Sequence, residues 1–339
     1  MHLLKTSGVP PERGNGAPIV AGILVTLAVP AALTLLTVRD GGQLTFATEN
    51  PTPYGYTVSL TLFLIPALVM ALWLHSHPRY EIPKKAFWAT VAVLVPLGFG
   101  LDLFFGNTFF CFPNEGAVIG WYLPGWNWAR FAWIADLPIE EFIFYISGFV
   151  VCLLTYLWLD EYWLGCYDPG DLEKTANIER PLVQFSPVVL GVGITVGLAA
   201  VIHDALGAAG GDSRFPGYFL FLVAASMLPT SLLFKTASPF INWRAVSLTM
   251  IAMLLVSLMW EATLASPFGW WRYHENMMLG IYIDAWRHLP LEAVFVWILV
   301  TFTTVVFYET VRQIVGSNLP LWVALFGPIN EQEQESSQD

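Results

Sequence analysis

Long apolar stretches alternate with short polar segments along the whole chain. Because the hydrocarbon core of a bilayer needs about 20 apolar residues per helix, each long stretch predicts one transmembrane helix. Eight stretches qualify: 18–38, 56–74, 86–105, 137–158, 185–206, 215–234, 245–264 and 289–310. A further apolar stretch, Leu319–Phe326, is too short to cross and is expected at the membrane interface. The pattern predicts an all-α integral membrane protein with eight transmembrane helices.

The composition agrees with this pattern. Charged residues make up 12% of the chain and hydrophobic residues 56%, whereas soluble domains carry about 25% charged residues. So much apolar surface excludes a soluble globular protein. The net charge is −11, and no cluster of lysine and arginine forms the basic surface that nucleic acid binding requires. We therefore expect a lipid bilayer as the surroundings and no nucleic acid partner.

Lysine and arginine are unevenly distributed between the two sets of loops. The loops on the side of both termini carry ten of the 15. The other side carries five: Arg39, Arg130, Arg214, Arg272 and Arg287. Positive residues accumulate on the cytoplasmic side of membrane proteins. We therefore predict a multi-pass protein of the cytoplasmic membrane with both termini in the cytoplasm.

A short motif occurs twice, in equivalent parts of the chain. The fourth predicted span opens with Leu-Pro-Ile-Glu at 137–140, and the eighth opens with Leu-Pro-Leu-Glu at 289–292. An acidic residue stands near the end of the preceding span in each case, Asp102 in one half and Glu261 in the other. These matches indicate an internal repeat.

The repeat divides the chain into two halves with four predicted spans each. Because that number is even, both halves enter the membrane from the same side, which makes them parallel repeats. We predict an N-terminal aqueous segment 1–17, a first repeat 18–163, an acidic linker 164–184, a second repeat 185–312, and an interfacial segment with an acidic tail 313–339. The first repeat also carries a tryptophan-rich insertion from Trp121 to Phe131.

Glu140 and Glu141 stand in the first turn of a helix that continues into the hydrocarbon core. Glu292 occupies the matching turn in the second half. Ionisable residues within spans are candidates for a functional site. However, Pro-x-Glu is also a favourable start for any helix, because proline suits the first position and the free N–H groups favour negative charge. Both interpretations remain open for these glutamates.

Asp102 and Glu261 are the second pair of candidates. Each lies near the end of a long apolar stretch, on the same membrane side as the repeated motif. A catalytic role competes with an ordinary carboxylate at the water interface, or with an ion-pair partner for Arg130 or Arg287.

Aromatic residues gather between these acids in both halves. The candidates for substrate binding are Phe110, Trp121, Tyr122, Trp126, Trp260, Trp270, Trp271 and Tyr273. Phe144 is a further candidate, since it is four residues from Glu140 and shares its helix face. Tryptophan and tyrosine are common at membrane interfaces, but aromatic faces also stabilise cations. An acid beside an aromatic wall is what proton-initiated chemistry on a polyene requires.

Motifs for cofactors and metals are missing from the sequence. There is no P-loop, no G-x-S-x-G and no G-x-G-x-x-G before a predicted helix, and the Gly-Val-Gly at 191–193 lies inside an apolar stretch. The six histidines and three cysteines have no metal-ligand spacing. We therefore expect neither a cofactor nor a bound metal.

These motifs resemble the membrane-embedded lycopene cyclases, the type built from two small homologous subunits or from one fused chain. The matching pieces are Pro-Ile-Glu-Glu-Phe-Ile-Phe at 138–144, its weaker echo Pro-Leu-Glu at 290–292, the acidic ends of the preceding spans, and the duplication. The resemblance covers about 56–163 and 215–312. The second half departs from the pattern, because Glu292 is followed by Ala293 rather than by a second acid.

The resemblance implies a cofactor-independent isomerase, an intramolecular lyase of the lycopene β-cyclase type, acting on a carotenoid dissolved in the bilayer. Glu140, Glu141 or both would protonate the terminal alkene of an acyclic end group, and another double bond of the chain would attack the cation and close a six-membered ring. Asp102 would relay or accept a proton, and aromatic residues would shield the cation. Candidate partners are a second copy of the chain and other carotenoid-pathway enzymes.

Two other functions remain open at this point. A divergent relative could be a membrane terpene cyclase, or a carotenoid hydratase, that acts on another isoprenoid. A proton-coupled transporter or lipid carrier would also use pseudo-symmetric halves and intramembrane acids. Transporters favour breaks inside their spans, whereas Pro138 and Pro290 stand at predicted helix starts, which counts against transport.

Overall fold

The described part of the chain forms a bundle of membrane-spanning helices. The computed structural model describes residues 53–76, 83–128, 130–165, 181–208, 214–286, 288–317 and 319–327. Within these residues, seven helices are long and apolar enough to cross a membrane. A mostly helical, multi-pass membrane protein is thereby confirmed. The first predicted span, 18–38, lies outside the described residues, as do 1–17, most of the linker and the acidic tail, so eight spans in two repeats stay a prediction.

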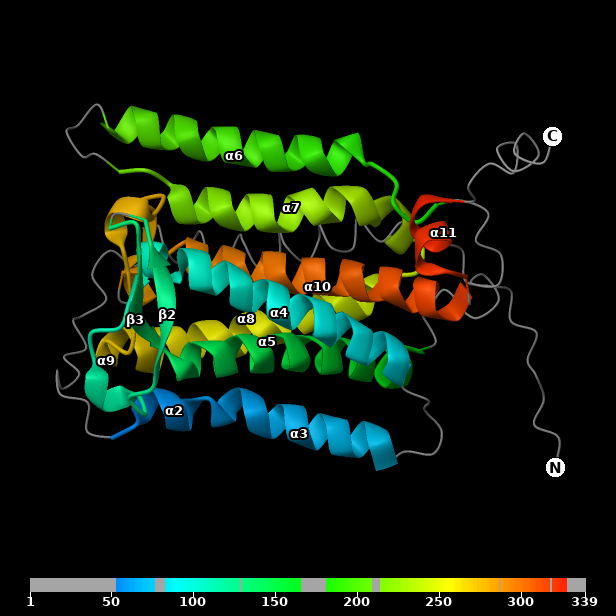
Figure 1. Ribbon diagram of the computed structural model, residues 1–339, viewed down its shortest axis with the longest axis horizontal. Helices are drawn as coiled ribbons and strands as arrows, with labels where there is room; N and C mark the ends of the chain where they lie inside the picture. The colour runs from blue at the N-terminus through cyan, green and yellow to red at the C-terminus, as the bar shows by residue number, and fades with distance from the viewer. Residues whose placement is uncertain are drawn as a thin grey trace.

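The seven spans begin within three residues of the predicted stretches and end two to seven residues beyond them. They are α2 and α3 (Gly55–Ser59 and Thr61–Ser76), α4 (Lys84–Phe109), α5 with a π-helical end (Ile139–Leu157 and Trp158–Trp163), α6 (Pro187–Ala208), α7 (Gly217–Ala237), α8 with a π-helical turn and α9 (Trp243–Trp260, Glu261–Ala265 and Ser266–Phe268), and α10 (Glu292–Ser317). The short helix α11 (Leu321–Phe326) follows at the end where α10 finishes (Figure 1).

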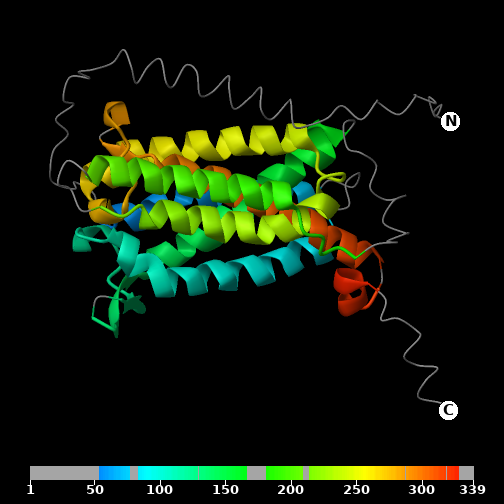
Figure 2. The same ribbon diagram turned by 90° about the horizontal axis from the view of Figure 1, so that it is seen from above.

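The helices lie side by side along the long axis of the molecule, with α5 and α10 central to the packing. Helix α3 packs on α5, and α7 packs on α10, while α4 and α8 each contact both α5 and α10. Helix α6 packs on α7 at one edge of the bundle, and α2 and α3 lie at the opposite edge (Figures 1 and 2). The neighbours of α5 (α3, α4 and α8) and those of α10 (α7, α4 and α8) are therefore arranged in the same way around these two central helices.

Short antiparallel strand pairs connect the helices at one end of the bundle. Strand β1 (Phe110–Cys111) pairs with β4 (Arg272–Tyr273) and so joins the segments that follow α4 and α9. Strands β2 (Tyr122–Asn127) and β3 (Ala132–Pro138) form a hairpin that packs on α4 at this end (Figure 1). The much shorter β5 (Tyr282–Ile283) and β6 (Leu289–Pro290) pair in the same way. The predicted insertion is therefore the extension of a hairpin.

The start of α5 and α10 differs from the prediction. Pro138 and Pro290 were expected at the first helical position, but each is the last residue of a strand. The N–H group of Ile139 donates to the carbonyl of Trp121 at 2.8 Å, and that of Leu291 donates to the carbonyl of Ile281 at 2.9 Å. Strand-like hydrogen bonding therefore continues past each proline, and the helix starts one or two residues later.

Prolines also occur inside three spans. Pro66 lies in α3, Pro96 in α4 and Pro229 in α7, and each of these helices continues through its proline. The argument that prolines at helix starts count against transport is therefore wrong, because mid-span prolines are present as well. Proline positions do not distinguish a transporter from an enzyme here.

The basic residues of the described segments predict which end faces the cytoplasm. Lys84, Lys85, Lys235 and Arg244 lie in end turns at the end of the bundle away from the strands, and Arg312 lies in α10 five residues before it finishes at the same end. By the positive-inside rule, the strand end should face outward. We expect a topology reporter fused after Asp339 to read cytoplasmic and one inserted at Asn127, in the long hairpin, to read external. A cytoplasmic signal at Asn127 would reverse the orientation.

Candidate active site

Two adjoining cavities lie among α4, α5, α7, α8 and α10, close to the strand end. The long cavity runs beside α4 from Phe109 to Leu94 and has about 840 Å³ of space free of protein atoms, its mouth included. The acid cavity contains Glu141 and Glu261 and has about 690 Å³. Tyr145 lines both cavities. Mostly apolar walls with a few polar groups are typical of small-molecule sites.

Glu141 lines the acid cavity, and its carboxyl group accepts a hydrogen bond from one neutral side chain. The hydroxyl of Tyr56 donates to Oε2 of Glu141 at 2.7 Å, and Tyr56 is fully buried. The ring of Trp270 stacks on Tyr56 with the centroids 6.1 Å apart. A Cβ atom at Gly55 would lie 2.8 Å from the Trp270 ring, so glycine is needed for this approach. Packing around α2 thus holds the donor against the carboxyl group of Glu141.

Glu261 faces the same cavity from the other half of the chain. It begins the π-helical turn that follows α8, and π-helical turns are frequent at functional sites. Its Oε1 atom accepts hydrogen bonds from the hydroxyl of Tyr273 and, at 3.4 Å, from Nε1 of Trp271. Burial and the nearby Glu261 raise the pKa of Tyr273 well above its usual value, so Tyr273 keeps its proton and remains a donor.

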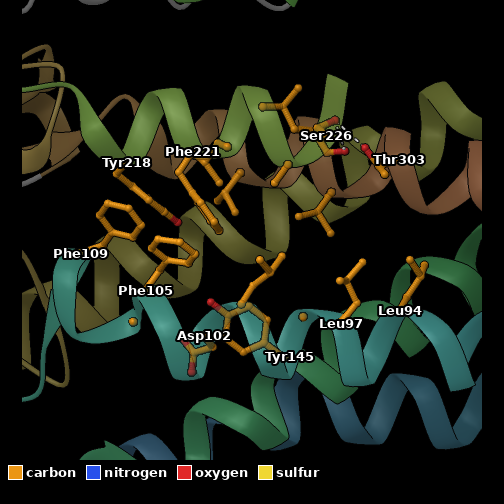
Figure 3. Close-up of a pocket in the computed structure, with 18 of the residues that line it drawn as sticks. Leu94, Leu97, Asp102, Phe105, Phe109, Tyr145, Tyr218, Phe221, Ser226 and Thr303 are labelled. Carbon is orange, nitrogen blue, oxygen red and sulfur yellow. Dashed lines mark hydrogen bonds between the residues drawn. The ribbon is translucent and has the colours of Figure 1, made fainter. Parts of the chain in front are cut away.

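Asp102 lies in the wall of the long cavity, on α4. It is buried, and neither of its carboxylate oxygens has a hydrogen-bond partner within ordinary distance among the described residues. The side chain of Tyr145 lies directly beside it (Figure 3). Burying a carboxyl group without partners is costly, which is unusual for a purely structural residue. Asp102 is therefore not an exposed carboxylate at the water interface.

Glu140 and Glu292 lie outside both cavities and fix the helix starts instead. Oε1 of Glu140 accepts hydrogen bonds from the N–H group of Ile119 at 2.7 Å and from the hydroxyl of Thr57 at 2.6 Å. Oε1 of Glu292 accepts one from the N–H group of Leu279 at 2.6 Å. Both glutamates are fully buried. Each therefore ties the first turn of a central helix to the loop before a strand.

The acid cavity has aromatic walls drawn from both halves of the chain. Its aromatic lining residues are Tyr56, Phe110, Phe144, Tyr145, Phe149, Tyr218, Trp260, Trp271, Tyr273 and Trp297. The rings of Phe144 and Trp260 are 5.1 Å apart, and those of Trp260 and Trp271 are 4.8 Å apart. Phe144, expected to share its surroundings with Glu140, lines the cavity with Glu141 instead. Carboxyl groups and aromatic faces thus surround one space.

The other aromatic candidates do not reach the cavities. Trp121 is 72% exposed. Tyr122 lies in strand β2, and Trp126 packs against Trp133 in the hairpin. Trp270 is buried behind Tyr56 and is not part of the lining. Their aromatic character alone had pointed to these residues, but Trp121, Tyr122 and Trp126 belong to the hairpin at the bundle end.

Three tyrosines at the site were not singled out in the sequence. Tyr145 lies four residues after Glu141, so the helical spacing could have placed both on one face. Tyr56 and Tyr218 each stand at the beginning of a span, and only an alignment of the two halves would have drawn attention to them. No local signal links Tyr56 to Glu141, which lies 85 positions away in the chain.

The cavity walls contain no positive side chain. No Lys, Arg or His is among the residues that line the two cavities. A phosphate or diphosphate group would therefore meet carboxyl groups without a counter-charge. Within the described segments, no group of His, Cys, Asp and Glu could hold a metal ion. The groups that this space offers are carboxyl groups beside aromatic rings.

The close contact between Gly106 and Asp102 gives a test of this geometry. A Cβ atom at Gly106 would lie 2.7 Å from Oδ1 of Asp102, so Gly106→Ala must displace that carboxyl group. We expect roughly tenfold lower turnover of any substrate that reacts beside Asp102, at normal protein abundance, since small displacements of reacting groups are costly. Gly100→Ala on the same helix has no atom within 4 Å and should leave turnover unchanged. Equal turnover in both variants would contradict this geometry.

Comparison of the chain with protein-family models, with curated proteins and with solved structures gives no match. The residues of the two cavities and their arrangement in space are therefore the basis for assigning a function.

Proposed function

We propose that this protein is a membrane-embedded carotenoid cyclase, which closes a ring at an acyclic end of a lycopene-like substrate by proton transfer alone. The observation that carries the proposal is the convergence of Glu141, Glu261 and Asp102 on adjoining, aromatic-walled cavities without a positive charge. Protonation of a terminal double bond starts the cyclisation of a polyene that has no leaving group, without any oxidant. A carboxyl group beside aromatic faces supplies both the proton and the stabilisation of the cation.

In this proposal Glu141 is the acid. It would transfer its proton to the terminal double bond of the end group, leaving a tertiary cation. The pair of electrons of a second double bond would attack that cation and close a six-membered ring, which moves the positive charge into the ring. The hydrogen bond from Tyr56 to Oε2 would hold the carboxyl group in place and stabilise the carboxylate that protonation leaves behind.

A base must then remove a proton from the ring cation. Asp102 and Glu261 are the candidates, and we favour Asp102 because Tyr145 is the one side chain that interacts with it as a hydrogen-bond donor among the described residues, whereas Glu261 accepts two hydrogen bonds. A free carboxylate oxygen can accept a proton without first losing a hydrogen bond. The choice of carbon from which the proton is lost would set the type of ring.

The two halves would be parallel four-span repeats that build a single site between them. Matching interactions support the repeat. Besides the glutamate contacts, the N–H group of Tyr54 donates to the carbonyl of Gly116, and that of Phe215 donates to the carbonyl of Asn276, both at 2.9 Å. Since Glu141 and Glu261 come from different halves yet share one cavity, both ends of a two-ended substrate would react in the same place.

The other functions are less well supported. A hydratase would have to admit water to the cation, whereas aromatic rings form most of the acid cavity wall. A diphosphate-ionising terpene cyclase would need positive charge or a metal, and the cavity lining offers neither. A transporter would use the acids for proton coupling, but it gives no account of the aromatic wall around them.

The proposal is tested by the pigments of cells that accumulate lycopene and express the gene. We expect ring-containing isomers of lycopene on chromatography and mass spectrometry, and unchanged lycopene in cells with the Glu141→Gln variant at equal membrane abundance. Unchanged lycopene in cells with abundant wild-type protein would reject the proposal. A product heavier by one water molecule would favour the hydratase.

A further inference from the structure

We propose that the long cavity is a side channel that opens to the lipid between α4 and α7 and holds the body of a linear hydrocarbon substrate while only one of its ends reaches the acids. This inference rests on the proposed function, because it assigns to the acids the end that reacts. The substrate would enter from the lipid, and the protein would recognise the body of the hydrocarbon chain as well as the end that reacts.

The shape and lining of the cavity fit an extended apolar chain. Its lining residues on α4 extend from Leu94 to Phe109, which corresponds to about 22 Å at the rise of an α-helix. Phe105 and Phe109 stand with Tyr218 and Phe221 at one end, and Leu94 and Leu97 stand at the other (Figure 3). Asp102 lies between them. A rod-shaped hydrocarbon would lie along this wall with its tip at the acids.

The cavity opens on the surface of the bundle. Leu97 on α4 and Ala225 on α7 both line the cavity, yet Leu97 is 54% exposed and Ala225 is also exposed. Near the acids α4 and α7 meet, since the rings of Phe105 and Phe221 are 5.1 Å apart. Leu97 and Ala225 are interior positions of spanning helices, so the surface around them faces hydrocarbon rather than water. The opening therefore leads into the lipid.

A long polyene is the occupant that suits both ends of this channel. At the inner end, carboxyl groups need an alkene on which to act, and a saturated lipid chain has none. At the outer end, exposed Leu97 and Ala225 leave the passage open to lipid. A molecule longer than the channel leaves its far end in the bilayer, where the protein does not contact it. The site would thus accept long isoprenoids with one acyclic end, whatever group stands at the other.

Adjacent alanines on α7 allow a matched test. Ala225→Phe would fill the channel, whereas Ala224→Phe adds the same ring at an exposed position that does not line it. We expect Ala225→Phe to lower lycopene turnover about tenfold, since overfilling a cavity costs binding energy, and Ala224→Phe to turn over like wild type. Lycopene retained through purification in the inactive Glu141→Gln background, measured by its absorbance, should fall by a similar factor with Ala225→Phe only.

A second pair on α4 guards against misfolding of the α7 variant. Leu97→Trp should reduce retained lycopene, and Val93→Trp should not, because Val93 is exposed but lies outside the lining. If both channel variants bind and turn over lycopene like their controls, the channel is rejected, even when Glu141→Gln abolishes turnover. If the channel variants lose lycopene binding but the wild-type protein forms no ring, the channel stands and the cyclase is rejected. A retained phospholipid in place of lycopene would also overturn the channel.

Discussion

Glu141→Gln is expected to abolish ring formation almost completely while the protein stays folded. The amide keeps the shape of the side chain and an oxygen that accepts the hydrogen bond from Tyr56, but it has no proton acidic enough for an alkene. General acid catalysis contributes about 10²–10⁴-fold, so turnover of lycopene by the purified variant should fall by at least about 10². Membrane abundance and thermal stability should stay close to wild type.

Glu140→Gln is the matched control, one residue earlier on the same helix. The carboxyl group of Glu140 lies outside the cavities and accepts hydrogen bonds from Ile119 and Thr57 through a single oxygen, which an amide oxygen can replace. We expect turnover near wild type. Loss of turnover in Glu140→Gln combined with full turnover in Glu141→Gln would exchange their roles and would refute the assignment of the acid by cavity geometry.

Asp102→Asn is expected to give the second largest effect and to change the products as well as the rate. If Asp102 removes the proton from the ring cation, its loss should lower turnover by about 10²-fold and shift the ratio of ring isomers, since another group or water must then take a proton. Chromatography of the products from purified protein measures both effects. A purely structural role would lower the rate without altering the isomer ratio.

Stability provides an independent readout for the same variant. Asp102 is a buried carboxyl group beside the hydroxyl of Tyr145. The oxygen of an amide can still face that hydroxyl, so replacing the carboxylate with a neutral amide removes a desolvation cost. The thermal stability of Asp102→Asn should equal or exceed that of wild type. Asp136→Asn, on the exposed face of the hairpin, is the control and should change neither rate nor products. A destabilised Asp102→Asn protein with normal products would contradict the role as base.

The seven spans of the described segments could be predicted because the bilayer imposes a length and an apolar composition on every helix. Their ends could not be predicted to the residue. Leu137 and Pro138 continue an apolar run in the sequence, yet they form the end of a strand. The partner of that strand lies across a hairpin, and β1 pairs with β4 from the other half of the chain. Such pairings depend on how the helices pack, which no local pattern contains.

The candidate acids could be found from the sequence, but their separate roles could not. Successive residues of an α-helix point about 100° apart, so Glu140 and Glu141 must face different surroundings. Which of them faces a cavity depends on the rotation of α5 within the bundle. Spacing favoured Glu140, because Phe144 lies four residues after it, whereas Phe144 lines the acid cavity together with Glu141. The partner of Glu141, Tyr56, comes from a distant helix.

The central claim, cyclisation by proton transfer without a cofactor, is tested most directly with the purified protein in liposomes that contain lycopene and only buffer outside. The account predicts conversion to ring-containing products of the same mass as lycopene, without added flavin, nicotinamide or metal and unaffected by EDTA. In heavy water, each new ring should acquire deuterium from the acid. Unchanged lycopene in the presence of folded protein, or conversion that depends on an added cofactor or metal, would contradict the account.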